Sequence, residues 1–166
     1  MVHSENPMLH VFVYGTLKKG FRNHDHHCQG VLSVEPAVVV GRLYDLGVGY
    51  PAMQIPESAI IAQGSVNHVA DVCVLAEHSA SQYTQTPVES DEWGDVHGEV
   101  LSFAYPYSQL EAMDRLEGFR PGRQSHYLRV MTYALWDGAL QPVWVYVMPE
   151  IGRGKLIADG VWVDTR

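Results

Sequence analysis

The stretch LHVFVYGTLKKG, residues 9–20, decides the fold of this chain. Its first half, residues 9–14, alternates apolar and aromatic side chains, a pattern typical of a buried β-strand. Gly15 follows at once, and glycine after such a run favours a tight turn. The sequence therefore predicts a strand that delivers a turn made of Tyr14, Gly15, Thr16 and Leu17.

The rest of the chain contains several short β-rich runs. Residues 31–46 are rich in valine and are interrupted by Pro36 and Gly41, which favours a long, bent or bulged strand pair rather than a helix. Asp137 and Gly138 join two further β-rich runs and form a strong hairpin signal. We expect strands at residues 31–46, 59–63, 98–104, 127–136 and 140–148, and a loop at residues 47–53.

Two segments have helical spacing. Apolar side chains recur at helical intervals through residues 66–76. In the second segment, Ser108 and Glu111 have the spacing of a capping box, and Gly118 stands where a helix would stop. Between these segments, residues 79–95 are polar and are expected to form an exposed excursion.

Many short strands without regular alternation with helices argue against a doubly wound parallel sheet. We expect a mixed α+β fold, with a small mixed or antiparallel β-barrel and short flanking helices. Residues 1–166 would form a single domain, because no stretch has the composition of a linker.

The composition excludes several classes of protein. With 46% hydrophobic and 18% charged residues, the chain is typical of globular proteins. Its net charge of -8 makes nucleic acid an improbable partner, and no apolar run is long enough to span a membrane. Residues 1–10 lack the features of a secretory signal, so a cytoplasmic location is expected. Two cysteines without CxxC spacing indicate neither a disulfide framework nor a zinc site.

The turn after the first strand is a candidate binding site. Successive N–H groups at such a turn form a small concavity suited to a carboxylate or to a carbonyl oxygen that gains charge. Gly15 lacks a Cβ, so a ligand could approach the backbone there. The alternative is an ordinary turn in which Gly15 serves only the geometry.

Glu117 is the candidate acid or base. It lies at the C-terminal end of the predicted helix, where the helix dipole and partial burial would both raise its pKa. A carboxyl group of that kind suits proton transfer near neutral pH. The alternative is a surface glutamate paired with Arg120 or Arg123.

Two other clusters are open to interpretation. His24, His26 and His27 could suggest a metal hydrolase, but adjacent side chains rarely converge on one ion, and a polar short helix is favoured. Arg120, Arg123 and Arg129 could bind a substrate carboxylate or balance the acidic loop.

Several motifs together resemble the γ-glutamylcyclotransferase-like family, which includes the AIG2-like proteins and γ-glutamylamine cyclotransferase. The motifs occur in order along the chain: YGTLKKG at 14–20, NH at 23–24, GRLY at 41–44, GYPA at 49–52, HGEV at 97–100, LEG at 116–118 and YLR at 127–129.

The resemblance implies a small β-barrel whose cavity is bounded by the YGTL turn. It places the family's catalytic glutamate at Glu117 and implies substrate binding by Tyr14, Gly15, Thr16, Leu17, Tyr127 and Arg129. The implied reaction is the cofactor-independent conversion of a γ-glutamyl amine or γ-glutamyl amino acid into 5-oxoproline and a free amine. A non-catalytic small-molecule-binding protein of the same fold is the alternative.

The chain departs from the family pattern in two places. Residues 119–125 carry an insertion, which lengthens the spacing between Glu117 and Tyr127. The polar excursion at residues 79–95 is also additional. Both lie where they could reshape the mouth of the cavity.

Overall fold

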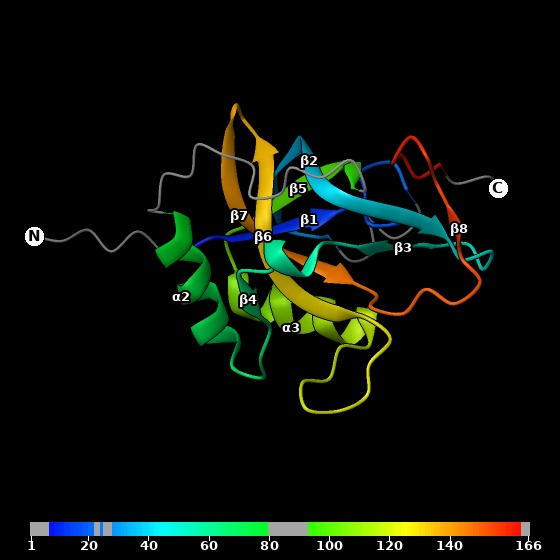
Figure 1. Cartoon of the computed structure of the whole chain (residues 1–166). Helices are drawn as coiled ribbons and strands as arrows, with labels where there is room; N and C mark the ends of the chain where they lie inside the picture. Colours follow the sequence, from blue (N-terminus) through cyan, green and yellow to red (C-terminus); the bar gives the residue numbers. More distant parts are fainter. Residues whose placement is uncertain (1–6, 22–23, 25–27, 80–92, 164–166) are drawn as a thin grey trace, which may run out of the picture.

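The structure is a computed structural model that describes residues 7–21, 24, 28–79 and 93–163. Two helices and a strand-rich sheet make up the described part of the chain (Figure 1). The helices are α2 (His68–Ser79) and α3 (Pro106–Glu117), with a short 3-10 helix, η1 (Glu57–Ala59). The strands are β1 (Leu9–Val13), β2 (Val31–Asp45), β3 (Pro51–Gln54), β4 (Ala62–Gln63), β5 (Gly94–Phe103), β6 (Leu128–Trp136), β7 (Ala139–Val147) and β8 (Lys155–Leu156).

Strand β1 lies in the middle of the sheet. The strand order is β3-β2-β5-β1-β7-β6-β4, with β8 paired to β2. β1 pairs antiparallel with β5 and parallel with β7, and the other pairs are antiparallel. A contact between β2 and β6, Val38 to Leu135, closes the path into a ring. The predicted mixed α+β class with flanking helices is confirmed, and the sheet is ring-like.

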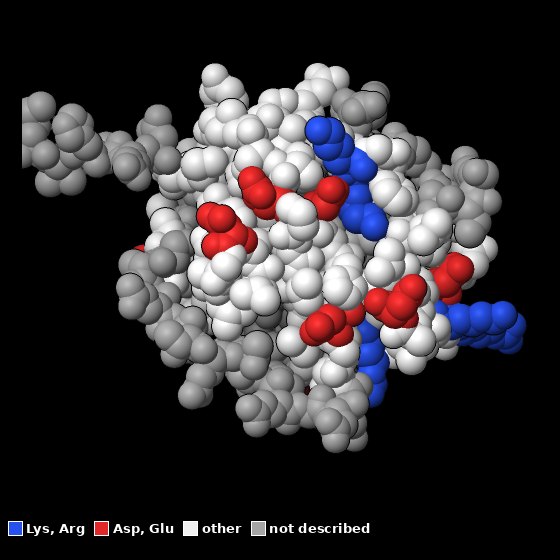
Figure 2. Space-filling view, turned by 90° about the horizontal axis from the view of Figure 1, so that it is seen from above, with Lys and Arg blue, Asp and Glu red and all other residues white. Residues whose placement is uncertain are grey.

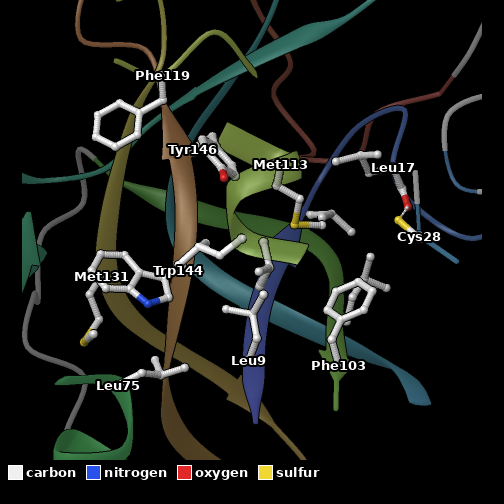
Figure 3. Close-up of a cluster of buried hydrophobic side chains, with 14 of the residues drawn as sticks. Leu9, Leu17, Cys28, Leu75, Phe103, Met113, Phe119, Met131, Trp144 and Tyr146 are labelled. Carbon is white, nitrogen blue, oxygen red and sulfur yellow. Dashed lines mark hydrogen bonds between the residues drawn. The ribbon is translucent and has the colours of Figure 1, made fainter. Parts of the chain in front are cut away.

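The alternation in β1 supplies two cores, one on each face of the strand. Leu9, Val11 and Val13 pack in the cluster that also holds residues of both helices. Phe12 and Tyr14 point the other way, into the cluster inside the ring. Figure 3 shows the first cluster, with Leu9, Met113 and Trp144 converging between strands and helices. A strand buried on both faces fixes the position of the turn that follows it.

Helix α3 carries Glu117 as its last residue. Gly118 follows with φ 68°, a left-handed conformation that suits glycine, and its N–H group bonds to the Arg115 carbonyl oxygen. The predicted stop is therefore confirmed. The predicted capping box is wrong: the helix begins at Pro106, and the N-cap Tyr105 makes no side-chain capping bond. Proline at the first helical position starts this helix without a capping side chain.

Most strand predictions hold, with three differences. The hairpin of β6 and β7 is confirmed, with Asp137 and Gly138 at φ 52° and 75°. Residues 31–46 form one long strand rather than a strand pair, with a register shift near its start. Part of the expected loop at residues 47–53 is strand β3, and only Ala62–Gln63 of residues 59–63 is strand, preceded by η1. Most of the excursion predicted at residues 79–95 lies outside the described residues, but its two ends are not loop: Ser79 ends α2, and Gly94 and Asp95 begin β5.

The described surface agrees with the acidic composition. On the face in Figure 2, the few Lys and Arg side chains lie apart from one another among Asp and Glu. A basic stripe, which nucleic-acid binding would use, does not form on the described part of this face. Among the described helices, none has the length and apolar character needed to cross a membrane.

Candidate active site

Three polar contacts hold the turn after β1 in place. The Lys18 N–H group donates to the Gly15 carbonyl oxygen at 3.1 Å and closes the turn. The His24 imidazole Nδ1 lies 2.8 Å from the Leu17 carbonyl oxygen, and the Lys19 N–H group donates to Glu99 Oε1 at 2.6 Å. Within the described residues, the N–H groups of Gly15 and Leu17 have no acceptor. The turn therefore leaves these two N–H groups as available donors.

Gly15 is buried, and its environment differs from the expectation. A Cβ built on Gly15 would lie 2.8 Å from Cγ and 2.9 Å from Cδ of the Pro51 ring. The space beside the glycine is therefore filled by Pro51, and the direction of the missing side chain is closed to a ligand. Both residues still line the same pocket. Glycine is required here for close packing of the turn against β3.

Glu117 faces the turn across a pocket of about 360 Å³. Its side chain is partly buried, and the structure gives it no hydrogen bond or ion pair to another described residue. The alternative of a surface pair with Arg120 or Arg123 does not occur in this geometry. Desolvation by burial raises the pKa of Glu117 from 4.5 to about 7. A carboxyl group with that pKa can both accept and return a proton at neutral pH.

Two tyrosines complete the wall beside Glu117. The Tyr127 hydroxyl donates to the Pro51 carbonyl oxygen at 2.8 Å, and the Tyr14 hydroxyl donates to the Tyr146 carbonyl oxygen at 2.6 Å. Burial raises the pKa of both tyrosines, and the charge of Glu117 raises it further. Both phenols are therefore neutral and can still accept a hydrogen bond from a ligand N–H group. The insertion at residues 119–125 does not keep Tyr127 from the pocket.

The pocket brings together five of the six binding residues predicted from the sequence, as well as Glu117. It is lined by Phe12, Val13, Tyr14, Gly15, Thr16, Leu17, Tyr50, Pro51, Leu116, Glu117, His126, Tyr127, Tyr146 and Met148. Sequence reasoning did not select Phe12, Tyr50, Pro51, His126, Tyr146 or Met148. Tyr50 and Pro51 lie in the GYPA motif, which could have predicted their place in the pocket. The sequence around Tyr146 predicts only a buried strand.

Arg129 is the predicted binding residue that the structure does not bring to the pocket. Its side chain is fully buried. Its guanidinium donates to Asp114 Oδ1 at 2.7 Å and to Asp71 Oδ2 at 2.9 Å, so its charge is already paired. Tyr127 and Arg129 are two residues apart, so both lie on the helix-facing side of the chain, but only Tyr127 lines the cavity, because Asp71 of α2 and Asp114 of α3 bind the Arg129 guanidinium. The arginine faces the two helices instead.

His24 is the member of the histidine cluster that the structure describes. His24 is buried, and its Nδ1 is engaged with the Leu17 carbonyl oxygen. His26 and His27 lie outside the described residues. Among residues 7–21, 24, 28–79 and 93–163, no three His, Cys, Asp or Glu side chains are grouped as metal ligands would be.

These features define a class: a small mixed α/β protein with a ring-like sheet, an N–H-lined turn and one desolvated carboxyl group in a common pocket. A family model described as γ-glutamyl cyclotransferase, AIG2-like matches residues 11–89 and 75–164. The chain therefore belongs to this family, and the family resemblance predicted from the sequence motifs is confirmed.

Individual relatives are more distant. The chain is similar to the γ-L-glutamyl-butirosin B γ-glutamyl cyclotransferase of Niallia circulans, with 38% identity over 55 residues. That match covers 33% of this chain and 35% of the curated relative, so it spans about a third of either protein.

Solved structures agree on the fold. YkqA from Bacillus subtilis matches with a TM-score of 0.52 and 20% identity, over 93% of this chain and 39% of that one. The E. coli protein c4763, described as specific to uropathogenic strains, matches with a TM-score of 0.51 and 12% identity, over 93% and 92%. At these identities the likeness concerns the fold alone.

Proposed function

We propose that this protein is a γ-glutamyl cyclotransferase in which Glu117 is the general acid and base. The observation that carries the proposal is the Glu117 carboxyl group, unpaired among the described residues, with a pKa of about 7, in a pocket shared with the turn of Gly15 and Leu17. Membership of the family supports the reaction class. The substrate would be a small γ-glutamyl compound.

The reaction is an intramolecular aminolysis. The α-amino nitrogen of the substrate attacks its own γ-carbonyl carbon, and a new C–N bond closes a five-membered ring. The C–N bond to the leaving amine then breaks, which gives 5-oxoproline and the free amine. No oxidant, reductant or water molecule is consumed. Because nucleophile and electrophile share one molecule, holding a near-attack shape could supply as much as roughly 7 to 11 kcal/mol.

Each pocket group has a role in this proposal. Glu117 accepts a proton from the substrate ammonium group and donates one to the departing nitrogen, which is worth about 10² to 10⁴ in rate. The N–H groups of Gly15 and Leu17 stabilise the oxyanion that forms on the γ-carbonyl oxygen. The phenol oxygens of Tyr14 and Tyr127 accept hydrogen bonds from the amino group.

The alternative is a protein that binds a γ-glutamyl compound without converting it, since a fold does not fix a function. One experiment separates the two. The protein is incubated with γ-glutamyl dipeptides and γ-glutamylamines, 5-oxoproline and free amine are quantified, and affinity is measured by calorimetry. Equal amounts of 5-oxoproline and amine support the enzyme. Binding without product formation would favour the alternative.

A further inference from the structure

A buried polar network lies directly behind the pocket. Its centre is the Asp114 carboxylate of α3, which accepts a bidentate pair of bonds from Arg129, Nε to Oδ1 at 2.7 Å and Nη2 to Oδ2 at 3.0 Å. Asp114 Oδ1 also accepts the Tyr146 hydroxyl at 2.6 Å. The Arg129 Nη1 atom reaches Asp71 of α2 at 2.9 Å. The network therefore joins both helices to strands β6 and β7.

Three of the four members of the network are linked along the chain to the pocket. Asp114 precedes Glu117 by three residues, so the two lie on neighbouring positions of one helical face. Arg129 follows Tyr127 by two residues. Tyr146 belongs to both sets, because its ring lines the pocket while its hydroxyl bonds to Asp114. The network thus touches three of the elements that form the wall around Glu117.

The geometry of the network is tightly defined. A bidentate guanidinium–carboxylate pair fixes orientation as well as distance. The Arg129 guanidinium carbon also lies 4.6 Å from the centre of the Trp144 ring and 5.2 Å from that of Phe119, which comes two residues after Glu117. Figure 3 shows the Phe119, Tyr146 and Trp144 side chains of this part of the core. An apolar core of equal volume would often be as stable as such buried charges, so stability alone does not explain them.

We propose that Arg129 and Tyr146, acting through Asp114, are positioning residues that hold the last turn of α3 so that the Glu117 carboxyl group points into the pocket. The catalytic part of this inference rests on the proposed function. Among the described residues, the titratable groups that line the pocket with Glu117 are Tyr14, Tyr50, His126, Tyr127 and Tyr146.

Two charge-conserving variants test the inference. Tyr146→Phe removes one hydroxyl and keeps the ring, and Arg129→Lys keeps the cation but loses the bidentate pair. The matched control is Thr132→Val, because Thr132 is buried on β6 and donates to the Ala59 carbonyl oxygen at 2.8 Å without lining the pocket. Thermal melting confirms folding, and all assays are run well below the melting temperature.

The first readout separates kcat from KM for 5-oxoproline formation. A misplacement of about 1 Å can cost roughly 10²-fold in rate. We expect kcat to fall about tenfold or more in Tyr146→Phe and Arg129→Lys, with KM within about twofold of wild type. Thr132→Val is expected to keep kcat. If Tyr146→Phe and Arg129→Lys melt at a lower temperature but keep the wild-type kcat, the network is purely structural and the inference is wrong.

The second readout does not need turnover. Carboxyl ¹³C NMR of protein labelled at glutamate, with the Glu117 resonance assigned by its loss in Glu117→Gln, gives the pKa of Glu117 directly. We expect a value near 7 in wild type and in Thr132→Val, and a fall toward 4.5 in the two network variants as water reaches the carboxyl group. An unchanged pKa in both folded network variants would overturn the inference. If that pKa falls but the wild-type protein forms no 5-oxoproline, the positioning role stands and the proposed function fails.

Discussion

The Pro51 ring occupies the space that a side chain on Gly15 would need, with Cγ 2.8 Å from the position of its Cβ. This contact ties the turn after β1 to the start of β3. The Pro51 carbonyl oxygen also accepts a hydrogen bond from the Tyr127 hydroxyl, so Pro51 contacts both the turn at Gly15 and Tyr127. A change at Gly15 therefore acts on the stability of the protein as well as on its pocket.

We predict that Gly15→Val lowers both the melting temperature and the turnover rate, and that Gly15→Ala does so to a smaller degree. Overpacking of this kind costs about 1 to 3 kcal/mol of unfolding free energy. A double-mutant cycle with Pro51→Ala measures the contact, since removal of the ring makes room for the added methyl group. If Gly15→Ala costs the same stability with and without the Pro51 ring, the contact does not explain the glycine.

The raised pKa of Glu117 predicts the pH dependence of catalysis. Glu117 must be ionised to accept the ammonium proton, so kcat/KM should fall tenfold per unit as pH drops below about 7. Initial rates of 5-oxoproline formation are measured between about pH 5 and pH 9, and they give the pH at which kcat/KM is half of its maximum. A midpoint near 4.5, the ordinary value, would mean that the carboxyl group is not desolvated in the free enzyme.

The same shift predicts a gain in stability on removal of the charge. Between about pH 4.5 and 7 the folded protein binds more protons at Glu117 than the unfolded chain does, so this group makes the protein less stable as pH rises. Glu117→Gln should therefore have a higher melting temperature than wild type at pH 8. Its unfolding free energy should be higher by at most about 3 kcal/mol. At pH 4 the difference should disappear.

The matched control for this stability effect is Glu111→Gln. Glu111 is exposed on the same helix, and its ion pair among the described residues is with Arg115, four residues later, at 3.3 Å. Its replacement should change stability little at any pH, because exposed pairs of this kind are worth about 0.3 to 0.5 kcal/mol. A Glu117→Gln protein that is less stable than wild type at pH 8 would contradict the burial assigned to the carboxylate.

The composition of the pocket predicts the leaving group. Among the described residues, neither Lys nor Arg lines the pocket, and Arg129 is paired behind the wall. A carboxylate on the leaving group would be desolvated without a cationic partner. We predict that γ-glutamyl-n-propylamine has a kcat/KM at least about tenfold higher than γ-glutamyl-2-aminobutyrate, its carboxylated analogue, which corresponds to about 1.4 kcal/mol. Equal values would show that the pocket does not exclude the second carboxylate.

Local chemistry in the sequence predicts those parts of the structure that local forces determine. The alternation of residues 9–14, the Asp137-Gly138 turn and the stop at Gly118 each follow from the conformational preferences of a few neighbouring residues. The capping-box prediction is wrong because of another local preference. Pro106 starts the helix two residues earlier and leaves Ser108 inside it.

Tertiary contacts account for what the sequence does not predict. Arg129 follows Tyr127 in one motif, but Asp71 and Asp114, which bind its guanidinium, come from helices 58 and 15 residues away. The position of Pro51 against Gly15 likewise depends on the pairing of β3 with β2. Glu117 could be selected from its place at a helix end and from the family motif, whereas its desolvation depends on the tyrosines that three other segments bring to it.

In the proposed reaction, Glu117 transfers the protons as 5-oxoproline forms. The most direct test is the rate of 5-oxoproline release from γ-glutamyl-n-propylamine at pH 8, measured side by side for wild type, Glu111→Gln and Glu117→Gln. We predict that wild type and Glu111→Gln turn over at similar rates, while folded Glu117→Gln loses about 10² to 10⁴ of the rate, because an amide keeps the shape but cannot accept a proton. A folded Glu117→Gln protein that retains most of the wild-type rate would contradict the account.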